Sequence, residues 1–392
     1  MAGFLATWEL GQRYGHVATL APVAAALARQ GHRTIFAARD PETARLRAPG
    51  TFERILQAPI YTRRVDVGET LVYGQVIAEA GYVDVETVCA LVRGWLALFE
   101  MTAPDAILVE HAPVSLLAAH VAGIPAMRLG PTFTSPHARD PLPTLQPWIA
   151  HPQEEIAEAG KRADLIVRGT CRSFGAPALA GLAELLERSP NHALTWPELD
   201  HYGPQAGLVY HGPLAGIDAS AKPAWPDAPG PRTLVYHGLD TRAGNAAAKA
   251  LGRLGWPVIW HAQSAPSDPL PVNILFSSEP VDITALAREA DLYVSRGGHG
   301  ASAAMLRAGI PQLLLPDSLE SLLVAWRLQK AGIALAQSGT AGAEAVADAL
   351  QRIAGDGAMR STARALGGHY ADYDAQAAAD GVAASLCEAP RA

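Results

Sequence analysis

Short hydrophobic runs along the chain alternate with segments in which apolar residues recur at helical spacing. Residues 3–8 and 33–37 are apolar runs that flank a segment from His16 to Gly31. Within that segment the apolar positions lie three or four residues apart: Val17, Leu20, Val23 and Leu27. Short runs predict strands, and this spacing predicts an amphipathic helix that ends near Gly31. The opening therefore reads strand–helix–strand, the unit that builds a parallel sheet.

The same alternation returns along most of the chain. In the first half it predicts strands at 105–109 and 124–129 and a helix at 114–122. In the second half it predicts strands at 233–237, 257–260, 292–294 and 311–316 and helices at 244–254 and after residue 300. The last 25 residues are rich in Ala and are predicted to form a terminal helix. The pattern indicates an α/β protein with two doubly wound parallel sheets.

Two segments interrupt this pattern. Residues 131–153 are rich in Pro and His and predict a long irregular loop of the kind that often carries substrate contacts. Residues 219–231 contain Pro, Ala and Gly in a run that can hold neither a helix nor a central strand. We therefore predict a first domain at 1–215, a linker at 216–231, a second domain at 232–365, and a C-terminal helix at 366–392 that packs back on the first domain.

Composition narrows the class of protein. A length of 392 residues predicts two domains, and 49% apolar residues suffice for large cores. The net charge of −7 and the lack of a basic stripe give no support for nucleic-acid binding. Only three cysteines occur, which excludes a disulfide framework, and no apolar run is long enough to span a bilayer. With no basic stretch before an apolar run at the N-terminus, we expect a cytoplasmic protein without a transmembrane segment.

A glycine-rich segment between a predicted strand and a predicted helix is the strongest local signal. It runs from Arg296 through Gly297-Gly298-His299-Gly300-Ala301 to Ser302. Glycines let backbone N–H groups approach a ligand, and a helix start favours negative charge. Arg296 would add a bidentate partner for phosphate. The segment lacks the Gly-Lys-Ser/Thr of a Walker loop, and a plain glycine-rich turn without a ligand is the alternative.

Three further residues can carry proton chemistry. His16 lies at the start of the first predicted helix, where the helix dipole favours the neutral imidazole that can take a proton from a hydroxyl. Glu110 and His111 follow the strand at 105–109, at the carboxyl edge where catalytic partners collect. A surface or capping role for His16 and an ordinary loop role for the other two are the alternatives.

Metal and serine-nucleophile motifs are absent from the sequence. Asp372-Tyr373-Asp374 has metal-ligand spacing but falls in the predicted terminal helix, where residues two apart do not share a face. No His-Glu-x-x-His and no Gly-x-Ser-x-Gly pattern occurs. We therefore expect no metal site.

Several motifs follow one another in a fixed order over nearly the whole chain. They are Gly15-His16-Val17 with Gly31-His32, the strand from Pro104 to Glu110, Val209-Tyr210-His211-Gly212-Pro213-Leu214, Ala290-Asp291-Leu292-Tyr293-Val294-Ser295, and Ala308-Gly309-Ile310-Pro311-Gln312. Each motif is weak alone, but together they are specific. In this order the chain resembles the bacterial members of glycosyltransferase family 1, the UDP-glycosyltransferase-like enzymes of GT-B fold.

The resemblance implies two Rossmann-like domains that face each other across a cleft, the first for an acceptor and the second for a nucleotide diphosphate sugar. It implies an inverting, metal-independent transfer of the sugar to a hydroxyl or other nucleophile of a small molecule, as in natural product glycosylation. His16 is then the general base and Glu110 the acid that orients it. The donor-binding residues carried over are Val281 for the base, then Arg296, Gly298, His299, Gly300, Ala301, Ser302, Glu320 and Ser321. The donor is a co-substrate, and no cofactor is implied.

Four positions depart from the family pattern. Arg296 replaces a phosphate-contacting His, and Ala304 replaces a Glu that grips the ribose hydroxyls. Ser321 replaces the Gln that reads sugar hydroxyls beside Glu320, and Val324 replaces an Asn. These changes point away from an ordinary UDP-glucose donor and toward a dTDP-deoxysugar or another nonstandard sugar, with UDP and dTDP both left open.

Two other functions compete with glycosyl transfer. A non-catalytic GT-B homologue that serves as a binding or auxiliary protein is favoured by Ala304 and Ser321, whereas retention of His16, Glu110 and Glu320 argues against it. A sugar-nucleotide 2-epimerase of the same fold is disfavoured by the match at Gly15-His16. The acceptor, the linkage atom, contact with a membrane surface and the oligomeric state, a homodimer included, stay open.

Overall fold

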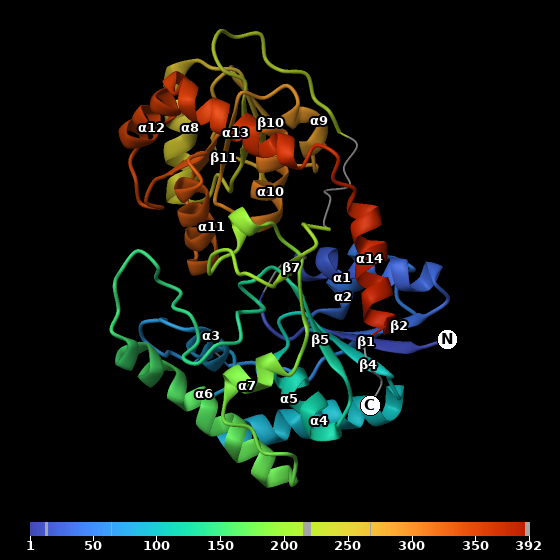
Figure 1. Ribbon diagram of the computed structural model, residues 1–392. Coiled ribbons are helices and arrows are strands. Elements are labelled where there is room, and N and C mark those ends of the chain that lie inside the picture. Colours follow the sequence, from blue (N-terminus) through green and yellow to red (C-terminus); the bar gives the residue numbers. More distant parts are fainter. Residues whose placement is uncertain (12–14, 64, 215–220, 267, 389–392) are drawn as a thin grey trace. The chain divides into compact units, whose positions relative to one another are not determined.

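The chain forms two compact units. In this computed structural model the described residues are 1–11, 15–63, 65–214, 221–266 and 268–388. The N-terminal unit comprises residues 1–215 and 374–392, and the C-terminal unit comprises residues 216–373. Each unit is a parallel sheet with helices packed on it (Figure 1). The predicted class, α/β with doubly wound sheets, is confirmed.

The N-terminal unit contains a seven-stranded sheet in the order β3-β2-β1-β4-β5-β6-β7. Its strands are β1 (Gly3–Thr7), β2 (Arg33–Ala38), β3 (Arg54–Gln57), β4 (Ala106–Val109), β5 (Ala126–Gly130), β6 (Asn191–Ala193) and β7 (Val209–Tyr210). β1 and β4 lie at the centre and are buried along their whole length. Leu5 of β1 pairs with Ile107 of β4 and with Ile35 of β2. Continuous apolar strands of this kind are typical of a parallel sheet covered on both faces.

Helices cover both faces of this sheet. They are α1 (Gly15–Arg29), α2 (Pro41–Arg47), α3 (Tyr73–Glu79), α4 (Val85–Thr102), α5 (Pro113–Ala122), α6 (Gln153–Phe174), α7 (Leu182–Glu187) and α14 (Ala375–Glu388). The C-terminal helix α14 packs against α1, where Arg29 and Asp380 form an ion pair of 2.6 Å and Val382 and Leu386 are buried. Helix α14 therefore completes the core of the N-terminal unit.

The C-terminal unit repeats the topology with six strands in the order β10-β9-β8-β11-β12-β13. The strands are β8 (Thr233–Tyr236), β9 (Val258–His261), β10 (Ile274–Ser277), β11 (Leu292–Ser295), β12 (Gln312–Leu314) and β13 (Ala334–Ala336). The helices are α8 (Arg242–Leu254), α9 (Ile283–Ala287), α10 (His299–Ala308), α11 (Leu319–Lys330), α12 (Ala343–Gly355) and α13 (Gly357–His369). The strands predicted from the sequence in this half are thus present.

The end of the chain differs from the single terminal helix that the sequence predicted. Helix α13 ends at His369 and belongs to the C-terminal unit, whereas α14 begins at Ala375 and belongs to the N-terminal unit. Asp372 and Asp374 therefore lie between two helices, not inside one, and the Asp374 carboxylate accepts a hydrogen bond of 2.8 Å from the backbone N–H of Gln376. The break between the two helices was not predicted from the sequence because Ala favours helix on both sides of it.

The segment predicted as a linker contacts the C-terminal unit. Ala221 forms a parallel bridge with Val281, and Lys222 forms an ion pair of 2.7 Å with Glu289. The part of this prediction at 216–220 lies outside the described residues, as do positions 12–14 of the predicted first loop and 389–392 of the predicted terminal helix. Residues 131–152 form neither helix nor strand, as the sequence predicted. Among the described residues no helix combines the length and apolarity needed to cross a membrane.

Candidate functional site

The point where strand order reverses locates the first candidate site. β1 is followed by α1 and β2 on one side, and β4 is followed by α5 and β5 on the other, so the two crossovers diverge between these neighbouring strands. Ligands of doubly wound folds bind outside the carboxyl ends of strands at such a switch point. His16 is the second residue of α1, and Glu110 directly follows β4. Topology therefore brings together two residues that are 94 positions apart.

The predicted catalytic pair is in direct contact. His16 Nδ1 lies 2.5 Å from Glu110 Oε2, with the His16 side chain 15% exposed and the Glu110 side chain 1% exposed. Thr134 donates a hydrogen bond of 3.3 Å to the other carboxylate oxygen, Oε1. A carboxylate only accepts hydrogen bonds, so the contact assigns the proton of a neutral His16 to Nδ1 and leaves Nε2 with a lone pair. Such a histidine can take a proton through Nε2.

The backbone of Gly11 passes close to this nitrogen. Gly11 has a φ of +80°, and a Cβ added to it would lie 2.3 Å from His16 Nε2 and 3.4 Å from His111 Nδ1. Any side chain at position 11 would thus collide with the imidazole of His16. Glycine is favoured where a backbone turn has positive φ and where it passes close to a ligand.

His111 lies beside the pair as a second, buried imidazole. Its ring centre is 5.7 Å from that of His16, and its backbone has a φ of +48°, in the left-handed region. The side chain is buried, and neither ring nitrogen has a hydrogen-bond partner in the described part of the chain. Burial, followed by the charges of His16 and Arg39, holds the pKa of His111 well below its ordinary value. The neighbour of His16 is therefore uncharged at neutral pH.

Glu9 ties the segment after β1 to the segment after β4. Its buried carboxyl group accepts hydrogen bonds of 3.1 Å and 2.5 Å from the backbone N–H groups of Val114 and Ser115, at the start of α5. The backbone N–H of Leu10 also donates to the carbonyl of His111 at 3.0 Å. Burial raises the pKa of Glu9 to about 8 against the lowering effect of the two N–H donors. Glu9 thus fixes α5, and with it the position of Glu110.

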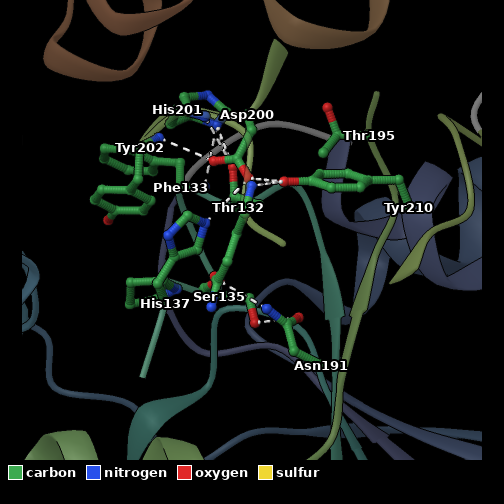
Figure 2. A network of polar contacts seen from close by, with 12 residues as sticks. Thr132, Phe133, Ser135, His137, Asn191, Thr195, Asp200, His201, Tyr202 and Tyr210 are labelled. Carbon is green, nitrogen blue, oxygen red and sulfur yellow. Dashed lines mark hydrogen bonds and ion pairs between the residues drawn. The ribbon is translucent and has the colours of Figure 1, made fainter. Parts of the chain in front are cut away.

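A buried polar network holds the irregular loop that supplies Thr134. Figure 2 shows Asp200 within hydrogen-bonding distance of three neighbours: His137 Nε2 lies 3.0 Å from Oδ2, Tyr210 donates its hydroxyl to Oδ2 at 2.6 Å, and Tyr202 donates its backbone N–H to Oδ1 at 3.0 Å. Although burial opposes it, hydrogen bonds from His137 and Tyr210 hold the pKa of Asp200 below its ordinary value. Asp200 is therefore ionised at neutral pH and anchors the loop through His137.

Arg128 of β5 also holds this loop through hydrogen bonds. Its buried guanidinium donates to the Ser135 hydroxyl at 3.0 Å and to the Pro136 carbonyl at 2.8 Å. Burial lowers the pKa of Arg128 to about 10, which leaves it charged at neutral pH. These contacts fix the conformation of the loop next to His16 and Glu110, although the loop contains neither helix nor strand.

The second candidate site lies at the equivalent point of the C-terminal unit. β8 and β11 are central neighbours whose crossovers diverge, and the glycine-rich segment follows β11. Gly298 is the N-cap of α10, and the backbone N–H of Ser302 is the first to bond within the helix, to the Gly298 carbonyl at 3.0 Å. The N–H groups of residues 298–301 precede that bond. Such a helix start favours an anion.

Arg296 and the turn before α11 surround this helix start. Arg296 Nη1 lies 3.2 Å from Asp317 Oδ2, and both side chains are partly exposed. Gly297 has a φ of +88°, and a Cβ there would lie 2.9 Å from the carbonyl oxygen of Ser321. Gly297 therefore allows the glycine-rich turn to pack against the start of α11.

The other predicted donor residues differ in how far their side chains are accessible. His299, Gly300, Ala301 and Glu320 are half-buried or exposed at the starts of α10 and α11. Ser302 is fully buried, and the hydroxyl of the buried Ser321 donates to the Ser318 carbonyl at 2.9 Å in the cap of α11. Val281 is buried and forms the bridge to Ala221. Ala304 packs against the core, and Val324 is fully buried.

Sequence reasoning missed Trp8, Glu9 and Gly11 of the first site. Trp8 ends the first apolar run and Glu9 and Gly11 lie in the polar stretch after it, and only their tertiary contacts distinguish them. Within the described residues no group of three or more His, Cys, Asp or Glu side chains is arranged to hold a metal ion.

Comparisons with known proteins agree with this architecture. Residues 249–388 match the family model described as "Erythromycin biosynthesis protein CIII-like, C-terminal domain". The chain is similar to CalG4, the calicheamicin glycosyltransferase, with 20% identity, a TM-score of 0.70 and 99% of each chain covered. It is also similar to the spinosyn rhamnosyltransferase SpnG complexed with thymidine diphosphate, with 21% identity, a TM-score of 0.67 and 98% of this chain and 100% of SpnG covered.

A second structure of SpnG, complexed with spinosyn aglycone, has 22% identity and a TM-score of 0.64, with 98% of this chain and 100% of SpnG covered. No curated protein matches the chain. At these identities the likeness establishes the fold, which is GT-B over the whole chain.

Proposed function

We propose that the protein transfers a sugar from a nucleotide diphosphate sugar to a small-molecule acceptor, because residues 249–388 match the EryCIII-like C-terminal domain model and the whole chain has the GT-B fold of natural-product glycosyltransferases. In this proposal the N-terminal unit binds the acceptor and the C-terminal unit binds the donor. The observation that carries it is the contact of 2.5 Å between His16 Nδ1 and Glu110 Oε2 at the switch point of the N-terminal sheet.

His16 is the general base of the proposed reaction. Its Nε2 takes the proton of the acceptor hydroxyl while the oxygen bonds to the anomeric carbon, and the bond from that carbon to the diphosphate breaks with its electron pair on the leaving group. Attack opposite the leaving group inverts the anomeric centre. Glu110 holds the tautomer and stabilises the imidazolium that forms. The acceptor proton thus ends on His16, and the electron pair of the broken bond ends on the diphosphate.

The glycine-rich turn is proposed to bind the diphosphate. The N–H groups of residues 298–301 and the guanidinium of Arg296 would meet the charge that grows on the leaving group, which is the role of electrostatic catalysis. These groups supply positive charge without a metal ion, so we propose a metal-independent reaction. The SpnG structure holds thymidine diphosphate. Together with the changes at Ala304 and Val324, this favours a dTDP-sugar as the donor.

A thermal-shift titration with UDP, dTDP, GDP and their sugar conjugates tests donor binding directly. A nucleotide that binds only the folded state stabilises it by about 2.7 kcal/mol at a hundred times its Kd. We expect a larger shift with dTDP than with UDP. Folded protein that responds to none of these nucleotides would contradict the proposal and favour the non-catalytic homologue.

A further inference from the structure

Trp8, the residue after β1, lies against the imidazole of His16. The two ring centres are 5.0 Å apart and the ring planes are inclined by 26°, which is a stacked arrangement. We propose that Trp8 is a positioning residue whose indole face stabilises the imidazolium form of His16. The role in catalysis rests on the proposed function, in which His16 takes a proton from the acceptor, whereas the contact itself does not.

The physical basis is the negative electrostatic potential over the face of an indole. A cation within about 6 Å of an aromatic ring centre is attracted to it, and Trp is the strongest of the aromatic partners. Trp8 is 1% exposed, so water does not screen the contact from its side. The attraction arises only when His16 carries a proton, which is after it has acted as a base. The indole therefore favours the proton-transfer step over the resting state.

The indole is fixed in this orientation. Its Nε1 donates a hydrogen bond of 2.6 Å to the carbonyl of Leu10, and the N–H of Leu10 donates to the carbonyl of His111 at 3.0 Å. Rotation of the ring would break the first bond in a buried site and leave the indole N–H without its acceptor. Trp8 thus presents one face to His16 while Glu110 contacts Nδ1.

Three other titratable or charged groups lie around this contact. Glu110 attracts the imidazolium directly, at 2.5 Å. His111 is kept neutral by burial, so it does not repel a charged His16. Arg39 donates to the carbonyl of Glu9 at 2.7 Å, and its charge acts against protonation of His111. Glu110 in the ring plane and Trp8 on the ring face therefore both stabilise the imidazolium of His16.

The test is an NMR titration of the His16 ring in the full-length protein. Trp8→Leu removes the aromatic face, and we expect the His16 midpoint to fall by roughly half to one pH unit. Trp8→Phe keeps an aromatic face and is expected to restore part of the shift. A fluorinated tryptophan introduced only at position 8 keeps the shape of the ring while weakening its negative face, so it should lower the midpoint without a change in packing.

A matched control separates this role from packing. Trp260 is fully buried in the C-terminal unit, in a different hydrophobic cluster from Trp8. Trp260→Leu is expected to lower the unfolding temperature as Trp8→Leu does, but to leave the His16 midpoint where it is. A midpoint that is the same in wild type and in the fluorinated variant would overturn the proposal, and this result does not depend on whether Trp8→Leu folds.

Donor binding keeps the two proposals distinct. If no nucleotide shifts the unfolding temperature of the wild type while the His16 midpoint still responds to Trp8, the proposed function fails and the indole–imidazolium contact stands. If nucleotides bind and sugar is transferred but the His16 midpoint does not change when Trp8 is substituted, the proposed function stands and Trp8 contributes only to packing of the core.

Discussion

The carboxyl edges of the two sheets share one topology but differ in construction. At the N-terminal edge, Glu110 is 1% exposed and its partner His16 is 15% exposed, so the pair is largely desolvated. At the C-terminal edge, Arg296 and Asp317 are 28% and 39% exposed. Contacts in low dielectric are stronger and more rigid, whereas exposed ion pairs exchange readily with water or a ligand. The largely buried N-terminal edge therefore suits proton transfer during bond formation, and the more exposed C-terminal edge suits reversible binding of an anion.

This difference predicts that the largest loss of turnover comes from the N-terminal edge. His16→Ala should reduce kcat by roughly 10²- to 10⁴-fold because it removes the base, while leaving the Kd for the nucleotide unchanged. Steady-state kinetics and nucleotide titration measure the two effects separately. His120→Ala, at a half-buried histidine of the same unit, is the control that should change neither. Equal loss of nucleotide affinity and turnover in His16→Ala would falsify the division of roles between the two edges.

The next effect concerns the pH dependence of stability at the N-terminal edge. The folded pKa of Glu9, about 8, lies above the ordinary value of 4.5, so the folded state holds this proton more tightly than the unfolded state. Its contribution is therefore fully present below pH 4.5 and is lost as pH rises toward 8. This group alone makes the unfolding temperature fall over the interval, whereas His111 and His192, whose pKa values burial holds below the ordinary 6.5, act in the opposite direction.

Glu9→Gln removes that titration, so the unfolding temperature of the wild type relative to Glu9→Gln should fall as pH rises from 4.5 toward 8. Hydrogen exchange at Val114 and Ser115 provides a local readout, since both N–H groups donate to Glu9. Asp317→Asn, at the C-terminal edge, is the control for the loss of one carboxylate. Parallel curves for wild type and Glu9→Gln would contradict the prediction.

At the C-terminal edge the main expected effect is on donor affinity. Arg296→Ala should raise the Kd for the preferred nucleotide by about 10- to 100-fold, the loss of one charge-assisted hydrogen bond, with kcat at saturating donor less affected. Asp317→Asn weakens the competing ion pair and should leave affinity unchanged or improve it. Isothermal titration with the nucleotide alone measures both. A larger loss in Asp317→Asn than in Arg296→Ala would show that the acid, not the arginine, is needed for binding.

The smallest expected effect compares one glycine from each edge. Gly11→Ala places a methyl group against His16 Nε2 at a φ of +80°, whereas Gly298 has a φ of −66° and no atom within 4 Å of an added Cβ. We therefore expect Gly11→Ala to lower the free energy of unfolding by about 1–2 kcal/mol and Gly298→Ala to leave it nearly unchanged. Denaturant unfolding distinguishes them. The reverse order would mean that the Gly11 turn relaxes around a side chain.

The sequence by itself determined the α/β class, the order of most central strands and the positions of His16, Glu110 and the glycine-rich turn. These follow from local information, because buried parallel strands are continuous apolar runs and a turn between strand and helix needs glycine. The resemblance supplied the GT-B fold for the same reason, since its motifs lie at strand ends. The break between α13 and α14 was not predicted because Ala favours helix on both sides of it.

Only the tertiary structure decided which side chains surround the candidate base. Trp8 ends a predicted strand, Glu9 and Gly11 lie in a stretch that is typical of an ordinary loop, and Thr134 lies in a segment without periodicity. Their roles arise from contacts with residues up to 106 positions away, such as the bond from Ser115 to Glu9. Such contacts depend on strand order and on the exclusion of water, and neither leaves a local pattern in the chain. Local sequence thus specifies the helices and strands, and the packing of these elements on the sheet brings the side chains of the candidate site together.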